Sequence, residues 1–233
     1  MPEASLWLIV PAAGVGQRMA AACPKQYLRV DSEYILDITL RRLLAALPAA
    51  GCIVPLSSTD IWWPSTNASS DGRIATCAGG NERANSVLNA LQALAPTAKN
   101  EDWVLVHDAA RPCVASDDLK RLLKKVGAHS VGGLLASPVT DTLKMASPQA
   151  PNTVSSTIDR RHLWRALTPQ VFRYGLLRDA LQGALNQGVA ITDEAAAMEQ
   201  AGHRPLLVEG RSDNIKITVP ADLALAGFIL GQL

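Results

Sequence analysis

The 233-residue sequence lacks an excess of charge of either sign, a long hydrophobic run and a targeting segment. Lysine plus arginine number 22 against 21 for aspartate plus glutamate, so there is no overall basic field to hold a nucleic acid or an anionic membrane. No apolar run approaches the roughly 18 residues of a membrane span, and the first residues lack a signal-peptide pattern. We therefore expect a soluble, cytoplasmic protein without nucleic-acid or membrane partners, in which any recognition of anions is local.

Paired metal-binding and redox motifs are also missing. The four cysteines, Cys23, Cys52, Cys77 and Cys113, show no C-x-x-C spacing, and the four histidines stand alone. This argues against a zinc site, a redox dithiol or a metal site built from histidine. We expect four free thiols in a reducing compartment.

Short apolar runs alternate with amphipathic segments, which is typical of an α/β sheet with crossover helices. Strands are expected at Leu6–Val10, Cys52–Leu56, Trp103–Val106, Gly132–Ala136 and Ile215–Thr218. Helices are expected at residues 35–47, 84–95 and 116–126, after Thr192 and after Pro220, with Ser116 and Thr192 as N-caps and Gly127 as a left-handed stop. Length and the absence of a linker favour a single domain over residues 1–233. The proline-containing stretch 137–160 has no helical periodicity, which would suit an excursion from the sheet.

A loop with two glycines follows the first apolar run. Gly14 and Gly16 precede Arg18 and Lys25, and bare amide N–H groups at such a turn can surround an anion. The dinucleotide fingerprint G-x-G-x-x-G requires glycine where the chain has Met19, and the P-loop pattern fails at the same position. The remaining interpretations are a loop for another polyphosphate ligand and a tight turn with surface cations.

Two further segments favour an anion site. Gly79 and Gly80 precede the helix expected at 84–95, where free N–H groups are available. Asp108 and Arg111 follow the expected strand Trp103–Val106, and ligands of open α/β sheets bind at the carboxyl ends of strands. Each pair also has a simpler interpretation, as a helix cap or a surface ion pair.

In combination, these segments resemble the 2-C-methyl-D-erythritol 4-phosphate cytidylyltransferase family of the non-mevalonate isoprenoid pathway. The matching segments are Pro11–Gly14 with Gly16, Arg18 and Met19, then Pro24–Tyr27, Gly79–Arg83, Val106–Pro112, Asp141–Lys144, Thr157–Arg160, Leu167–Gln170, Ile191–Glu194 and Gly210–Lys216. The resemblance implies a single Rossmann-like domain of the nucleotidyltransferase (GT-A-like) type, with a mostly parallel twisted sheet flanked by helices. It also implies an extended β-arm at about residues 137–160 for dimerisation.

The resemblance further implies transfer of CMP from CTP to the phosphate of 2-C-methyl-D-erythritol 4-phosphate, with Mg²⁺ as cofactor. A phosphate oxygen is already a nucleophile, so no activated Ser, Cys or His is needed, and His107 is expected to be structural. By resemblance the catalytic cations are Arg18, Lys25 and Lys216; the CTP contacts are Ala12, Ala13, Gly14, Gly16, Gly80, Ser86 and Asp108; and the substrate contacts are Arg111, Thr142, Arg160, Thr168 and Thr192. Asp108 is also expected at the metal, directly or through water. Thr142 and Arg160 would reach the active site of a neighbouring subunit in a homodimer.

Two alternatives remain at this stage: a cytidylyltransferase for another polyol phosphate, such as ribitol 5-phosphate, and a non-catalytic nucleotide-binding protein on the same fold. The chain also departs from the family, which commonly has aspartate where Asn81 stands. An amide keeps hydrogen-bonding capacity but loses the charge, so we expect no metal at this position.

Overall fold

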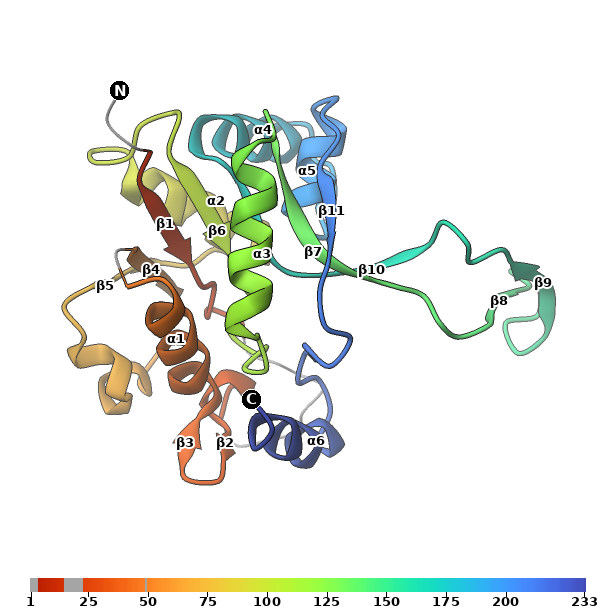
Figure 1. The fold of residues 1–233 in the computed structure, drawn as a ribbon, viewed down its shortest axis with the longest axis horizontal. Helices are drawn as coiled ribbons and strands as arrows, with labels where there is room; N and C mark the ends of the chain where they lie inside the picture. Colours follow the sequence, from red (N-terminus) through yellow and green to blue (C-terminus); the bar gives the residue numbers. More distant parts are fainter. Residues whose placement is uncertain (1–3, 15–22, 49) are drawn as a thin grey trace.

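The computed structural model describes residues 4–14, 23–48 and 50–233, and its centre is a seven-stranded sheet in the order β11-β7-β10-β6-β1-β4-β5. The strands are β1 (Leu6–Ile9), β4 (Gly51–Leu56), β5 (Ile74–Ala78), β6 (Trp103–Val106), β7 (Gly132–Pro138), β10 (Trp164–Arg173) and β11 (Leu206–Glu209). β10 runs antiparallel to both of its neighbours, β6 and β7, and the other neighbouring pairs are parallel. The expectation of a mostly parallel sheet flanked by helices is confirmed (Figure 1).

Helices cover both faces of this sheet. α1 (Ile35–Ala46) and α3 (Ser116–Gly127) pack on one face, and α2 (Arg83–Leu94), α4 (Tyr174–Asn186) and α5 (Glu194–Gln200) pack on the other (Figure 1). Successive residues of β1 serve both layers, because Leu8 joins the first core and Ile9 the second. A strand buried on both faces reads as an unbroken apolar run, which is why it was visible in the sequence.

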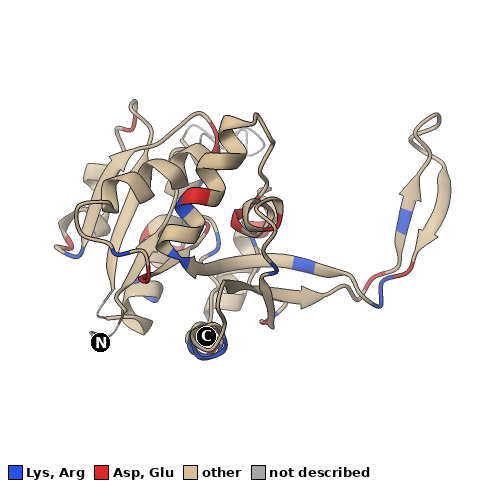
Figure 2. Ribbon diagram, turned by 90° about the horizontal axis from the view of Figure 1, so that it is seen from above, with Lys and Arg blue, Asp and Glu red and all other residues tan. Residues whose placement is uncertain are grey.

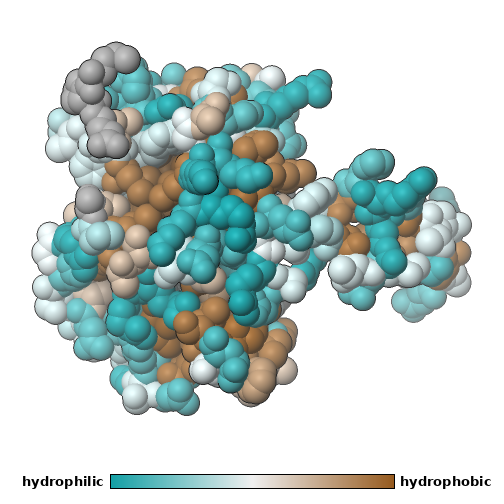
Figure 3. Space-filling view, viewed as in Figure 1, coloured by the Kyte–Doolittle hydropathy of each residue, from teal (hydrophilic) through white to brown (hydrophobic). Residues whose placement is uncertain are grey.

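A long excursion separates β7 from β10. Within it, β8 (Leu143–Ala146) and β9 (Val154–Ile158) pair antiparallel as a small separate sheet. Both ribbon views show this segment, called the arm from here on (residues 139–163), extending away from the body (Figures 1 and 2). Met145 and Val154 are exposed on it, and Figure 3 shows apolar patches there beside polar ones.

Several expected helix ends and one expected strand are wrong. Ala115, not Ser116, is the N-cap of α3. Gly127 is the last helical residue of α3 rather than a left-handed stop; Ala128 is the C-cap, and the His129 N–H donates to Val126 O at 2.8 Å. Asp193, not Thr192, caps α5, since its carboxylate accepts the Ala196 N–H. A free carboxylate is a better acceptor for an orphan amide than a hydroxyl.

The segment expected as the strand Ile215–Thr218 belongs to no sheet. It is extended and is tied to the body by the Ile217 N–H, which donates to Ala110 O at 2.8 Å. It leads into α6 (Ala221–Leu230), which begins after Pro220 as expected and packs with the hairpin β2 (Arg29–Val30) and β3 (Glu33–Tyr34) beside α1. All four cysteines are free, and no described helix is long and apolar enough to cross a membrane.

Candidate active site

A cavity of about 380 Å³ lies at the carboxyl ends of β1, β5 and β6. Because these strands are parallel, the loops that follow them meet at one edge of the sheet. The lining residues are Pro11, Ala12, Ala13, Gly14, Lys25, Gln26, Gly80, Asn81, Glu82, Arg83, Ser86, Asp108, Ala109, Ala110 and Lys216. Eight of the expected site residues therefore line one cavity. A larger cavity, of about 780 Å³, lies around Lys99–Asp102 and Arg173 and contains none of them.

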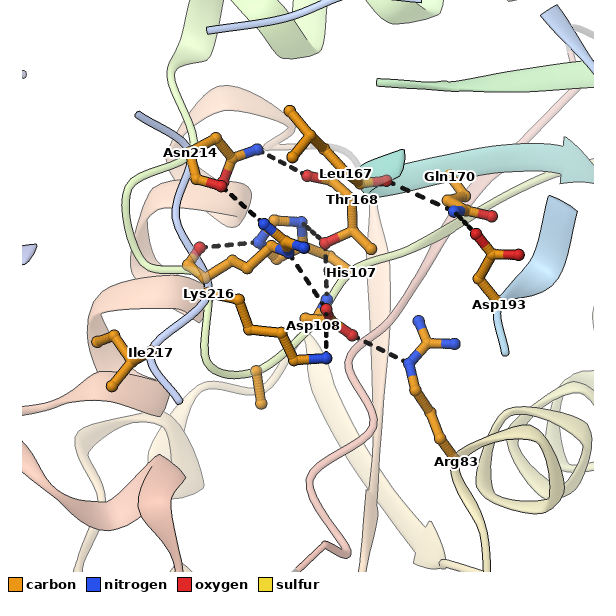
Figure 4. A network of polar contacts seen from close by, with 12 residues as sticks. Arg83, His107, Asp108, Leu167, Thr168, Gln170, Asp193, Asn214, Lys216 and Ile217 are labelled. Atoms are coloured by element: carbon orange, nitrogen blue, oxygen red, sulfur yellow. Dashed lines mark hydrogen bonds and ion pairs between the residues drawn. The ribbon is translucent and has the colours of Figure 1, made fainter. Parts of the chain in front are cut away.

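Asp108 is the centre of a cluster of cations at this cavity. Its Oδ1 accepts from Arg83 Nε at 3.0 Å, and its Oδ2 lies 3.2 Å from Arg111 Nε and 3.0 Å from Lys216 Nζ (Figure 4). Burial disfavours the Asp108 carboxylate, but the charges of Arg83, Lys216 and Arg111 hold its pKa well below the usual range. One carboxylate thus fixes three cations, and the cluster keeps an excess of positive charge at the cavity.

Glu194 neutralises one of these cations. Its buried carboxylate accepts from Arg83 NH1 at 2.6 Å and from NH2 at 3.1 Å, a bidentate pair. α5 presents Glu194 there because Gln170 of β10 accepts the Ala195 N–H and donates to Asp193. Burial opposes the charge of Arg83, yet Glu194 and Asp108 together raise its pKa. Three cations and two carboxylates leave the cluster a net charge of about +1, which Arg111 and Lys216 share.

His107 and Thr168 link Asp108 to the backbone of Arg111 through a chain of hydrogen bonds. The Asp108 N–H donates to Thr168 Oγ1 at 3.1 Å, the hydroxyl donates to His107 Nδ1 at 3.1 Å, and His107 Nε2 donates to Arg111 O at 2.9 Å (Figure 4). A carbonyl oxygen only accepts, so Nε2 carries the proton of a neutral ring. Burial lowers the pKa of His107 to about 4. His107 is therefore neutral at physiological pH and fully hydrogen-bonded, which agrees with a structural role.

The stability of the protein is expected to fall below pH 6.5 because of His107. In the folded protein His107 stays neutral down to about pH 4, whereas in the unfolded chain it takes up a proton near its ordinary pKa of about 6.5. Below pH 6.5 the unfolded state therefore binds more protons than the folded state, and the free energy of unfolding decreases as the pH falls. The expected loss between pH 7 and pH 5 is about 2 kcal/mol, measured by urea unfolding. His107→Gln should remove this part of the pH dependence; an unchanged slope in that variant would contradict the assignment.

Lys25 approaches the cluster from the loop after β1. It opens the short helix η2 (Lys25–Tyr27), and its Nζ donates to Ile217 O at 3.3 Å. Lys25 and Lys216 therefore meet at the same extended segment, on the cavity side. Gly16 and Arg18, which were also expected here, lie outside the described residues.

The turn between β5 and α2 forms the opposite wall. The Gly80 N–H donates to Ser86 Oγ at 3.0 Å, and Ser86 Oγ donates to Glu82 O at 3.1 Å, which fixes the first turn of α2. A Cβ added at Gly79 would lie 2.3 Å from Ala13 Cβ and 3.1 Å from Leu56 O. The two glycine-containing loops thus approach each other more closely than any side chain at position 79 allows.

Gly79→Ala is therefore expected to destabilise the fold by roughly 1–3 kcal/mol and to weaken nucleotide binding, because the loop with Ala13 must shift. Unfolding midpoints and nucleotide titration by calorimetry would measure both. Gly183→Ala is the matched control: Gly183 is helical with nothing within 4 Å of an added Cβ, so the change should stabilise by about 0.5–1 kcal/mol. Similar behaviour of the two variants would contradict the close approach.

The expected substrate contacts lie in the Asp108 network, on the arm and beside α5, and none of the five lines this cavity. Arg111 and the buried Thr168 belong to the Asp108 network, and Arg111 NH1 also donates to Asn214 O at 2.8 Å. Thr142 and Arg160 lie on the arm, where the Arg160 guanidinium donates to Thr140 O, and neither lines this cavity. Thr192 is exposed beside the start of α5.

The donor set does not by itself fit a Mg²⁺ ion. No cluster of three or more His, Cys, Asp or Glu residues suited to a metal occurs in the part of the chain that the structure describes. Asp108 uses both carboxylate oxygens for Arg83, Arg111 and Lys216. Mg²⁺ requires six oxygen ligands at short range, and most of them would have to come from a bound phosphate group and water.

Four residues of this site were not singled out from the sequence. They are Gln26, Arg83 and Asn214, whose side chains contact expected residues or their backbone, and Glu194, which contacts Arg83. Each stands inside a segment that resembles the family, which was the available signal. Their pairing is not readable from the sequence, because Arg83 and Glu194 are 111 positions apart.

Comparison with known proteins agrees with this geometry. The family model described as 2-C-methyl-D-erythritol 4-phosphate cytidylyltransferase matches residues 6–232. Proteins of that name from Ectopseudomonas mendocina and Hahella chejuensis are 54% and 48% identical, over 94% and 100% of this chain and 92% and 96% of their own length. The crystal structure of the Francisella tularensis protein of the same name superposes with a TM-score of 0.84 at 36% identity, covering 97% of this chain and 100% of that one. The Thermus thermophilus structure gives 0.76 at 30% identity, covering 99% and 100%. This chain belongs to the 2-C-methyl-D-erythritol 4-phosphate cytidylyltransferase family.

Proposed function

We propose that the protein transfers CMP from CTP to the phosphate of 2-C-methyl-D-erythritol 4-phosphate, giving 4-diphosphocytidyl-2-C-methyl-D-erythritol and pyrophosphate in isoprenoid precursor biosynthesis. The observation that carries this proposal is the cavity in which Lys25 and Lys216 face the backbone of two glycine-containing loops. Family membership over nearly the whole chain supports the same substrates.

The reaction needs charge compensation more than proton transfer. A substrate phosphate oxygen attacks the α-phosphorus of CTP, a new P–O bond forms, and the bond to the β-phosphate breaks with its electron pair leaving on pyrophosphate. Lys25 and Lys216 are the described cations for the charge that builds on these oxygens, and Arg18 is assigned with them from the sequence. The backbone of Ala12–Gly14 and Gly80 with Ser86 is proposed to hold the nucleoside, and Arg111 the acceptor phosphate.

Magnesium is proposed to arrive with the triphosphate. Its support is chemical, because a divalent cation reduces the repulsion between two polyanionic substrates. Asp108 already accepts from three cations, so it is proposed to act mainly on these cations, and any contact with the metal would use its remaining lone pair or a bridging water. A cytoplasmic location is proposed from the sequence alone.

The arm is proposed to complete the active site of a second copy in a homodimer. Thr142 and Arg160 belong to the arm, which extends away from the body (Figure 1), and neither lines its own chain's cavity. The exposed Met145 and Val154 offer the arm apolar contact area. A shared site makes a specific prediction. Equal amounts of inactive Lys216→Ala and inactive Arg160→Ala chains, unfolded and refolded together, should recover about a quarter of the wild-type activity, because half the sites of each mixed dimer are intact. Absence of recovery, with mixed dimers verified by mass, would show that each site uses its own arm.

A pyrophosphate-release assay with CTP, Mg²⁺ and a panel of polyol phosphates tests the function itself. We expect turnover with 2-C-methyl-D-erythritol 4-phosphate. Turnover only with ribitol 5-phosphate or another alcohol phosphate would overturn the specificity, and CTP binding without any turnover would favour a non-catalytic protein.

A further inference from the structure

The helix that carries Lys25 is too short to hold its own position. η2 consists of the three residues Lys25–Tyr27, and a single 3₁₀ turn contributes little stability of its own. The lysine side chain itself is long and flexible, and its Nζ donates to Ile217 O at 3.3 Å. The placement of the ammonium group therefore depends on what anchors η2 to the rest of the protein.

Gln26 is the first anchor. Its side chain is 3% exposed and donates to Ala12 O at 2.6 Å. The Ala12 N–H in turn donates to Pro55 O of β4 at 2.9 Å. Gln26 thus connects η2 to the central sheet through Ala12, in the loop that follows β1.

Tyr27 is the second anchor, and it reaches away from the cavity. Its hydroxyl donates to Asp60 Oδ2 at 2.7 Å, and its ring, 2% exposed, stacks on Trp62 with centroids 5.7 Å apart. Burial, and then Asp60, raise the pKa of Tyr27, so the phenol stays protonated as a donor. Tyr27 directly follows the cavity-lining pair Lys25 and Gln26, but Asp60 and Trp62 do not line the cavity.

Asp60 is itself rigidly held. Its other oxygen, Oδ1, accepts the N–H groups of Trp62 at 3.0 Å and Trp63 at 2.9 Å. One oxygen of the Asp60 carboxylate therefore holds the backbone of its own loop, and the other oxygen binds the Tyr27 hydroxyl of η2. This loop lies between β4 and β5 and carries the neighbouring Trp62 and Trp63.

We propose that Tyr27, Asp60 and Trp62 form a positioning clamp for Lys25, in which a loop outside the active site sets where the catalytic ammonium group lies. The clamp acts on Lys25 through the backbone of η2 and touches no substrate. This inference rests on the proposed function only in giving Lys25 a catalytic role.

Tyr27→Phe tests the clamp because it removes the hydroxyl and keeps the ring. We expect kcat to fall about 5-fold while KM for CTP changes less than about 2-fold, since a misplaced cation mainly affects the transition state. In a Lys25→Ala background the same change should leave kcat within about 2-fold, because the group that it positions is gone. Asp60→Ala should lower kcat at least as much as Tyr27→Phe, since it removes the acceptor of the phenol together with that of the Trp62 and Trp63 N–H groups.

Tyr174→Phe is the matched control. Tyr174 is also 2% exposed and donates its buried hydroxyl to Leu91 O at 3.0 Å, in the core on the other side of the sheet. It should lower thermal stability as much as Tyr27→Phe does and leave kcat unchanged. The same fold loss of kcat from Tyr27→Phe in the wild-type and Lys25→Ala backgrounds, or no loss at all, would overturn the proposal.

A second readout does not depend on turnover. The lysine side chains can be methylated reductively and observed by NMR, and the methyl signal of Lys25 is the one that is lost in Lys25→Ala. We expect Tyr27→Phe to shift this signal and Tyr174→Phe to leave it in place. An unmoved Lys25 signal would overturn the clamp even in an active enzyme. A moved signal in a protein without cytidylyltransferase activity would support the clamp and reject the proposed function.

Discussion

Lys25→Ala is expected to lower kcat for CMP transfer by about 100-fold or more, with a smaller change in KM for CTP. Lys25 lines the cavity together with Lys216, and in the proposed reaction its ammonium group would meet charge that is greatest in the transition state. Steady-state kinetics of pyrophosphate release would measure both constants. The same result is expected for Arg18→Ala from the sequence, although Arg18 lies outside the described residues.

Lys120→Ala is a matched control for the loss of a lysine. Lys120 lies on the exposed face of α3 and pairs only loosely with Asp117, at 3.7 Å. Such a surface pair contributes about 0–1 kcal/mol, so both activity and stability should be retained. If Lys25→Ala changed only KM, Lys25 would bind the ground state and transition state equally, and the catalytic role would be wrong.

Asp108→Ala is expected to have the largest combined effect, on stability and on activity. It leaves Arg83, Arg111 and Lys216 without their shared carboxylate in a largely buried cluster. Removing one partner of a buried ion pair costs roughly 3–5 kcal/mol, because the remaining charges stay desolvated. We also expect kcat to fall at least 10-fold, since Lys216 loses the contact that orients it. Urea unfolding and steady-state kinetics test the two parts separately.

Two variants make this result interpretable. Asp108→Asn keeps the volume and removes the charge, so it should reproduce most of the destabilisation if electrostatics dominates. Asp117→Ala, on the exposed surface of α3, should change stability by less than about 0.5 kcal/mol. If Asp108→Asn were nearly as stable as the wild type, the three cations would need no counter-charge, and the Asp108 carboxylate would not hold the cluster together.

Much of the fold was predictable because it depends on local patterns. The buried runs of β1 and β6 and the amphipathic α1 and α2 appeared where periodicity placed them. The errors came where a particular contact replaced a general rule. Asp193 caps α5 in place of Thr192, and Ile215–Thr218 is held by isolated backbone hydrogen bonds, such as that to Ala110, instead of a ladder. Such choices depend on neighbours that the sequence does not reveal.

The sequence by itself determined the family and most of the residues that line the cavity, because the backbone turns and cations of a phosphate site must stand at fixed places along the chain. Only the tertiary structure decided how those residues act on one another. Asp108 binding Arg83 and Lys216, Glu194 neutralising Arg83 and Tyr27 reaching Asp60 all join residues far apart in the sequence. The physical reason is that ion pairs and buried hydrogen bonds depend on distance, desolvation and direction, and these exist only once the strands have brought their loops to one edge of the sheet.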